Sequence, residues 1–251
     1  MKVSLSGLKG YATLSLAALM VGTASGQVPG AGTPAGMNAA MTRLFGDIKG
    51  FSAQTELRVM DGSQAEIVSM PMKFALLDQK IRIETDAAEV KNKSMPAGMT
   101  EALKRWGLAR VVSLIRPDKG LVYVLYPDQK ALLRFPLPDD GVSGAPKITK
   151  TPLGKETVAG HPCTKNKVVI SGGQSQAVEA TTWEASDLKG FPVQIETKDG
   201  GNTSVMRFRD IQLAKPDPAQ FYPPAGYTVY RNQDELGQAI QKKAEGGKEA
   251  K

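Results

Sequence analysis

The stretch VSMPMKFALLDQKIRIE, residues 68–84, sets the structural pattern of the chain. Apolar side chains occupy every second position of it, separated by small, polar or charged residues: Val68, Met70, Met72, Phe74 and Leu76, then Ile81 and Ile83. Such alternation is typical of strands with one buried face. Asp78-Gln79 supplies turn residues between the two runs. The stretch therefore predicts two neighbouring antiparallel strands that share one apolar face.

The same alternation continues on both sides of this stretch. Further strands are expected at 51–59, 110–115, 121–126, 131–135, 168–170, 177–183, 191–197, 203–211 and 227–230. Helical spacing of apolar residues predicts short amphipathic helices at 37–49 and 99–108, and Asn232 is placed to cap a final helix. Turn-length connections favour one large antiparallel sheet, which must twist and curl. The predicted fold class is mainly β (α+β): a curved sheet forming an incomplete barrel, with short helices over its concave face.

The chain divides by composition into four parts. Residues 1–26 combine Lys2 and Lys9 with a short apolar run and small residues, the pattern of a secretory signal peptide. Residues 27–36 form a Gly/Pro/Ala leader, 37–241 a single domain, and 242–251 a disordered Lys/Glu/Gly tail. The connector 136–147 is either a domain linker or, as we favour, a long loop within one sheet. We therefore expect an exported protein, located in the periplasm and soluble after cleavage.

The charge pattern does not favour nucleic acid. The whole chain has a formal net charge of +7, and removing Lys2 and Lys9 with the predicted signal peptide lowers the excess to +5. Basic and acidic residues are interspersed, whereas a nucleic-acid site clusters its basic residues. We expect no nucleic-acid partner; weak, transient contact with anionic lipid head groups is compatible with the excess.

The chain lacks the residues that most catalytic mechanisms and metal sites need. The chain has one histidine, His161, and one cysteine, Cys163, which form at most half of a zinc site. Cys163 is either buried on a strand, which we favour, or exposed and paired between molecules. Carboxylates are available at Asp139-Asp140, Glu66 and Glu84, but their settings indicate solvated turns and strand surfaces. We therefore expect no catalytic residues, no metal and no cofactor.

The apolar stripes supply the candidate site. Methionine and aromatic side chains on the inner face and on the helix at 99–108 would form a soft surface suited to acyl chains. The candidate cavity residues are Val68, Met70, Met72, Phe74, Leu76, Ile81, Ile83, Met99, Leu103 and Trp106. The competing interpretation is an ordinary core that is rich in methionine.

Several motifs, taken in order, give the chain a family resemblance. They are FSA at 51–53, KIRIE at 80–84, VYVLYP at 122–127, GKETVAGHPCTK at 154–165, WEASDLKGFPV at 183–193 and FYPPAGY at 221–227. With these motifs the chain resembles the LolA/LolB-like lipoprotein-carrier superfamily, and most closely a DUF4412-type family of exported proteins. The resemblance implies an incomplete barrel with helices over its opening, a hydrophobic cavity and no catalytic residues.

One residue role is not carried over from that superfamily. Its carriers use an arginine to hold the lid shut, and Arg82 is the position to compare first. The alternation places Arg82 on the face opposite Ile81 and Ile83, which predicts a solvent-facing side chain.

Two functions follow as expectations. The first is a periplasmic, non-catalytic binding protein that holds a lipid, an acylated protein or another amphiphile, as a carrier or a sensor. The second is a structural or regulatory envelope protein of the same fold with a filled core, acting through a protein partner.

Overall fold

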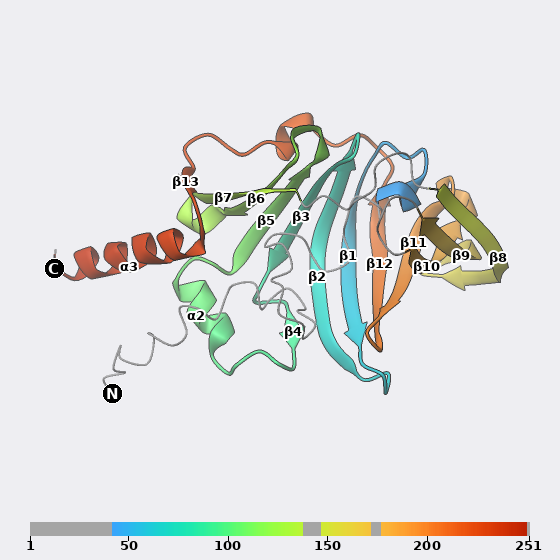
Figure 1. Ribbon diagram of the computed structural model, residues 1–251, viewed down its shortest axis with the longest axis horizontal. Coiled ribbons are helices and arrows are strands. Elements are labelled where there is room, and N and C mark those ends of the chain that lie inside the picture. The colour runs from blue at the N-terminus through green and yellow to red at the C-terminus, as the bar shows by residue number, and fades with distance from the viewer. Residues whose placement is uncertain (1–41, 138–146, 172–176, 250–251) are drawn as a thin grey trace.

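The computed structural model describes residues 42–137, 147–171 and 177–249. Within them a single 13-stranded sheet has the strand order β13-β7-β6-β5-β3-β2-β1-β12-β11-β10-β9-β8, and β4 pairs with β2 beside this path. Figure 1 shows how the sheet twists and curls from β13 to β8 without closing. The protein is therefore mostly β, with an open sheet, as the sequence predicts.

The elements have the following bounds. The strands are β1 (Gly50–Met60), β2 (Glu66–Leu77), β3 (Lys80–Asp86), β4 (Lys91–Asn92), β5 (Arg110–Arg116), β6 (Leu121–Tyr126), β7 (Ala131–Pro136), β8 (Lys147–Val158), β9 (His161–Ser171), β10 (Val178–Ala185), β11 (Phe191–Asp199), β12 (Asn202–Gln212) and β13 (Thr228–Tyr230). The α-helices are α2 (Met99–Arg105) and α3 (Gln233–Glu249). Short 3-10 turns are Arg43–Phe45, Pro117–Lys119, Pro127–Gln129, Ser186–Leu188 and Pro218–Phe221.

The two halves of the chain meet at β1. This strand pairs with β2 along one edge and with β12 along the other, both antiparallel. Strands from before and after the connector 136–147 therefore belong to one sheet. The expectation of a purely antiparallel sheet is wrong at one edge, because the three residues of β13 run parallel to β7. The chain reaches that edge by a long crossing from β12, and such a crossing permits either direction.

Alternation along the strands divides the sheet into two faces. We call the face that carries Phe51, Leu57 and Met70 the inner face, since these side chains belong to the main buried cluster. Directly paired residues of neighbouring strands point to the same side, so the registers extend this face from β2 across β1, β12 and β11. The alternation predicts that Phe51, Ala53, Thr55, Leu57 and Val59 of β1 share one face, and these residues are buried in the structure. The inward residues predicted for β2 and β3 are buried as well.

The outer face is covered over β2 to β7 by the segment between β12 and β13. Phe221 of this segment is fully buried against Ala75 and Leu77 of β2. Tyr227 packs on a second outer cluster, formed by Val112, Leu114, Leu125 and Leu132. The central strands are therefore apolar on both sides, as their sequences indicate.

Two arginines hold this crossing segment. Arg116, only 1% exposed, donates a hydrogen bond to the carbonyl oxygen of Phe221 at 2.9 Å and pairs with Asp118. Arg82 lies on the same outer face, where it pairs with Glu84 and donates to the carbonyl oxygen of Gln220. Arg82 thus points away from the inner face, as the alternation predicts, but it contacts the protein instead of solvent alone.

Three sequence expectations differ from the structure. Of the helix expected at 37–49, only residues from 42 on are described. They contain the 3-10 turn Arg43–Phe45, after which Gly46 has φ 57°. Strand β8 is not among the expected strands, because nearly all of its residues are exposed and no alternation results. Helix α3 continues to Glu249, through most of the segment 242–251 that the composition predicts to be disordered.

Other expectations fall outside the described residues. They are the signal peptide at 1–26, the leader at 27–36, residues 37–41 of the first helix, and the centre of the connector at 138–146.

Candidate ligand-binding site

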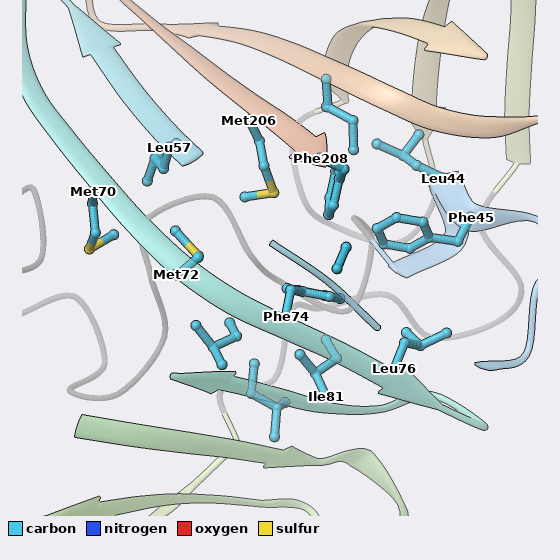
Figure 2. Close-up of a cluster of buried hydrophobic side chains, with 14 of the residues drawn as sticks. Leu44, Phe45, Leu57, Met70, Met72, Phe74, Leu76, Ile81, Met206 and Phe208 are labelled. Atoms are coloured by element: carbon cyan, nitrogen blue, oxygen red, sulfur yellow. The ribbon is translucent and has the colours of Figure 1, made fainter. Parts of the chain in front are cut away.

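One end of the inner face consists of flexible apolar side chains. We call it the methionine face; its members are Leu57, Val59, Val68, Met70, Met72 and Met206. The registers align Met70 with Leu57 and Leu57 with Met206 across three adjacent strands. Figure 2 shows Leu57 and the three methionines of this face, which come from β1, β2 and β12. Methionine is unbranched and polarisable, so such a surface can adapt to ligands of different shape.

The other end of the inner face is a filled aromatic core. We call it the aromatic cluster: Phe45, Phe51, Phe74, Phe191 and Phe208, whose neighbouring ring centroids lie 4.7 to 6.2 Å apart. Phe45 comes from the short turn before β1 and contacts the rings of the other four. These separations are those of well-packed aromatic pairs. The aromatic cluster therefore closes this end of the inner face, and Phe74, a candidate cavity residue, belongs to it.

Toward β8 the inner face carries four polar side chains beside apolar ones such as Val168 and Ala180. We call this part the polar strip: Thr182, Asn166, Glu184 and Lys150. Thr182 is fully buried and Asn166 is 5% exposed, whereas the Lys150 side chain is 41% exposed. Lys150 Nζ lies 2.6 Å from Glu184 Oε1, and Thr182 Oγ1 donates to the same carboxylate at 3.2 Å. The strip thus runs from buried hydroxyl and amide groups to a half-exposed ion pair.

The structure brings together most, but not all, of the candidate cavity residues. Val68, Met70, Met72, Phe74, Leu76, Ile81 and Ile83 share the inner face and are each at most 5% exposed. Met99 and Leu103 of α2 lie instead in a separate small cluster with Ala87 and Ala109. Trp106, just after α2, packs partly against the main cluster.

One hydrogen bond connects the turn between β6 and β7 to the end of helix α2. Gln129 Nε2 donates to the carbonyl oxygen of Trp106 at 2.6 Å. Gly107 follows with φ 63°, and a Cβ there would lie 2.9 Å from Gln129 Nε2, so glycine is needed for this close approach. The helix is therefore fixed beside the inner face mainly through Trp106, since Leu103 packs elsewhere.

Sequence reasoning misses several inner-face polar groups. The alternation does place Thr55 of β1 on the inward side, where it is 4% exposed. Burial raises the pKa of the Tyr126 phenol well above its usual range. Thr182 and Asn166 do not stand out in the sequence because short polar residues in strands normally indicate a solvated face. Only the strand registers show that they share the inner face with Ile195 and Met206.

The residues weighed for catalysis or metal binding are held in other contacts. Cys163 is a free thiol, 3% exposed on β9, and burial raises its pKa, in agreement with the favoured interpretation. His161 Nδ1 lies 2.8 Å from Asp187, which lowers the pKa of that carboxyl, and Glu84 and Glu66 pair with arginines. Asp139-Asp140 lie outside the described residues. Over the described ranges, no three His, Cys, Asp or Glu side chains are grouped as metal ligands would be.

The fold and the inner face define an open, predominantly β protein with an apolar face that ends in a polar strip. Among the helices of the described residues, none combines the length and the hydrophobicity needed to cross a bilayer. No model of a known protein family matches the chain, and no curated protein sequence matches it.

Solved structures do match. An uncharacterised conserved protein from Thermus thermophilus is 13% identical, with a TM-score of 0.45, over 77% of this chain and 97% of its own. A LolA superfamily protein from Nitrosomonas europaea is 11% identical, with a TM-score of 0.37, over 73% of this chain and 94% of its own. The Mycobacterium tuberculosis lipoprotein LppX is 15% identical, with a TM-score of 0.37, over 69% of this chain and 93% of its own. These are distant similarities in architecture.

Proposed function

We propose that this protein is a non-catalytic binding protein that holds a lipid, an acylated protein or another amphiphile against its inner face. It acts as a carrier or a sensor. The observation that carries the proposal is a single cross-strand row that changes from apolar to polar along its length.

The row follows from the strand registers. Starting on β2 it runs through Met70, Leu57, Met206, Ile195, Thr182 and Asn166. Directly paired residues share a face and lie about 5 Å apart, so the row is continuous. Its first four side chains are apolar and buried, and the last two are polar and buried. An amphiphile has the same arrangement, with an apolar acyl chain at one end and a polar group at the other.

The energetics favour an acyl chain on the apolar part of the row. Each methylene moved from water into apolar surroundings contributes about 0.8 kcal/mol. Methionine side chains adjust to such chains without a fixed shape requirement. Polar specificity then comes from the strip, where Lys150 and Glu184 are close enough to solvent to meet a head group.

The proposal also covers the finer expectations from the sequence. These are export by the signal peptide at 1–26, a periplasmic location in the cell envelope, transient contact with the outer membrane, and a relationship to DUF4412-type exported proteins. The motifs at 80–84, 154–165 and 183–193 support that relationship.

Lipid binding is tested on protein purified without detergent. Native mass spectrometry and organic extraction are expected to reveal a co-purified acyl lipid, and delipidated protein is expected to bind a fluorescent fatty acid. Protein that carries no lipid and does not bind the probe contradicts the proposal.

A second candidate function is supported by β8. This 12-residue strand is exposed along almost its whole length and, among the described strands, pairs only with β9. Leu153 on it is 54% exposed. Such an edge can accept a strand from a partner protein, as expected for an envelope protein that acts through its surface. A photo-crosslinker at Leu153 tests this: a single specific product from cells supports the partner function, and its absence opposes it.

A further inference from the structure

The inner face contains one polar group where its two apolar parts meet. Thr55 lies on β1, where it pairs with Met72 of β2 on one side and with Phe208 of β12 on the other. The next inward positions along β1 are Ala53, opposite Phe74, and Leu57, opposite Met70. Thr55 therefore stands at the boundary between the aromatic cluster and the methionine face.

The hydroxyl of Thr55 is buried without a hydrogen bond. The residue is 4% exposed, and its Oγ1 has no partner among the described groups. A hydroxyl removed from water without a partner is destabilising. A valine at position 55 would have nearly the same shape as threonine and would avoid the free-energy cost of the unpaired hydroxyl. The neighbouring inward side chains of β1, β2 and β12 are apolar, and none of them accepts a hydrogen bond from Oγ1 in this structure. They are Ala53, Leu57, Met72, Met206 and Phe208, with Phe74 beyond them.

We propose that Thr55 is the polar contact for the ligand, and that its hydroxyl donates a hydrogen bond to the carbonyl oxygen of an ester-linked acyl chain. This inference rests on the proposed function and narrows its ligand to acyl esters. Because an ester carbonyl accepts a hydrogen bond but carries no charge, it suits a site whose surroundings are otherwise apolar.

The orientation of the ligand follows from the neighbouring strands. On the β2 side of Thr55 the paired inward side chain is Met72, and on β3 Thr85 lies opposite Met72, followed by Ile83 opposite Phe74. The buried apolar members of this group, Met72 and Ile83, suit the acyl chain. On the opposite side the sheet leads over β12 and β11 to the polar strip on β10. The three strand spacings from β1 to β10 are about 14 Å, so the polar end of the ligand reaches the strip across the inward side chains of β12 and β11.

The experiment uses two probes that differ at the linkage. Palmitoyl lysophosphatidylcholine has an ester carbonyl, and its hexadecyl ether analogue has the same head group and a chain of matched length without that carbonyl. Dissociation constants for both are measured by calorimetry on the delipidated full chain and on two variants. Thr55→Val removes the hydroxyl at constant shape, and Thr55→Ser is the matched control that keeps it.

The expected result is a loss of selectivity in one variant only. Thr55→Val should weaken ester binding by about fivefold to tenfold, the effect of one lost hydrogen bond, and leave ether binding unchanged. Thr55→Ser should keep the preference for the ester. The melting temperature of ligand-free Thr55→Val should equal or exceed that of the wild type, because an unpaired buried hydroxyl is removed.

Other outcomes overturn the inference, and they separate it from the proposed function. If wild type binds both probes and Thr55→Val affects neither, or affects both equally, the hydroxyl does not contact the ester. If ligand-free Thr55→Val is clearly less stable than wild type, the hydroxyl has a partner within the protein. If wild type binds neither probe nor a fluorescent fatty acid, the proposed function itself fails.

Discussion

The guanidinium of Arg116 lies buried under the ring of Tyr222, with its centre 4.4 Å from the ring centroid. The same guanidinium donates to the carbonyl oxygen of Phe221 and forms a two-point contact with Asp118. One side chain of β5 thus fixes the long segment that crosses the outer face. Because this segment leads to β13 and α3, Arg116 influences the whole edge of the sheet.

Arg116→Met is expected to destabilise the protein. It keeps an apolar stem but removes the charged hydrogen bonds, so the free energy of unfolding should fall by about 2–3 kcal/mol. Arg110→Met is the matched control, since Arg110 pairs with Asp128 at the surface with its side chain 59% exposed. It should cost less than about 1 kcal/mol. Urea unfolding of both variants measures the difference, and equal losses would contradict the role of Arg116.

The pair of Asp118 and Arg116 should make stability depend on acid pH. The hydrogen bond from Arg116 holds the pKa of Asp118 below its ordinary value of 3.8. A carboxyl with a lowered folded-state pKa contributes stability that is present above its ordinary pKa and lost as the pH falls through the folded value. Wild type should therefore exceed Asp118→Asn in stability at neutral pH, and the gap should close below about pH 3.8. Because the Asp118 side chain is 45% exposed, we expect a gap below about 1 kcal/mol. Urea unfolding across the pH range checks it; a gap that stays constant below that pH would rule out the linkage.

Two lysines of similar exposure on opposite faces allow a test of the polar strip. Lys150, 41% exposed, pairs with Glu184 on the inner face, and Lys167, 49% exposed, pairs with Glu179 on the outer face. Lys150→Glu should weaken the binding of a fluorescent fatty acid by several-fold, because it places a negative charge beside Glu184 and opposes a carboxylate head group. Lys167→Glu changes the net charge equally and should leave the affinity unchanged. If both variants weaken the affinity equally, the cause is the change in net charge, and the polar strip is not the head-group site.

Gln129→Ala should loosen α2. The variant removes the hydrogen bond to the Trp106 carbonyl, and one such bond contributes about 1 kcal/mol. Hydrogen exchange of the amides in and just after α2 should therefore quicken by about fivefold, while the amides of β1 keep their protection. If α2 covers the ligand, the association rate of a fluorescent fatty acid should rise as well. Unchanged exchange in α2 would show that Leu103 and its small cluster hold the helix without Gln129.

The sequence predicts the centre of the fold well because the inward positions of its strands are apolar at every second residue. In residues 68–84 every inward position is apolar, and the register of β2 and β3 follows that alternation. The same reasoning misses β8, because most of its twelve residues are exposed and leave no periodic signal. It also misses the parallel pairing of β13, since three residues do not encode a direction.

The candidate site is predicted in part for a similar reason. Apolar alternation identifies which side chains of β2 and β3 point inward, but not which of them are locked in an aromatic cluster. Only the structure distinguishes the packed Phe74 from Met70, because it shows the rings of Phe45 and Phe208 around Phe74. Thr55 is visible on the inward side of its strand, yet an unpaired hydroxyl is a property of three-dimensional surroundings and leaves no mark in the sequence.

The sheet ends at β8 and β13, and the described residues do not pair these two strands with each other. In a closed barrel the number of strands and their stagger fix the radius. Here neither quantity constrains the curvature, so the two ends can move apart or together through small changes of twist between strands, without breaking a backbone hydrogen bond. The curvature of the sheet is therefore adjustable, and the proposed ligand-binding function extends to acyl chains of different length and number.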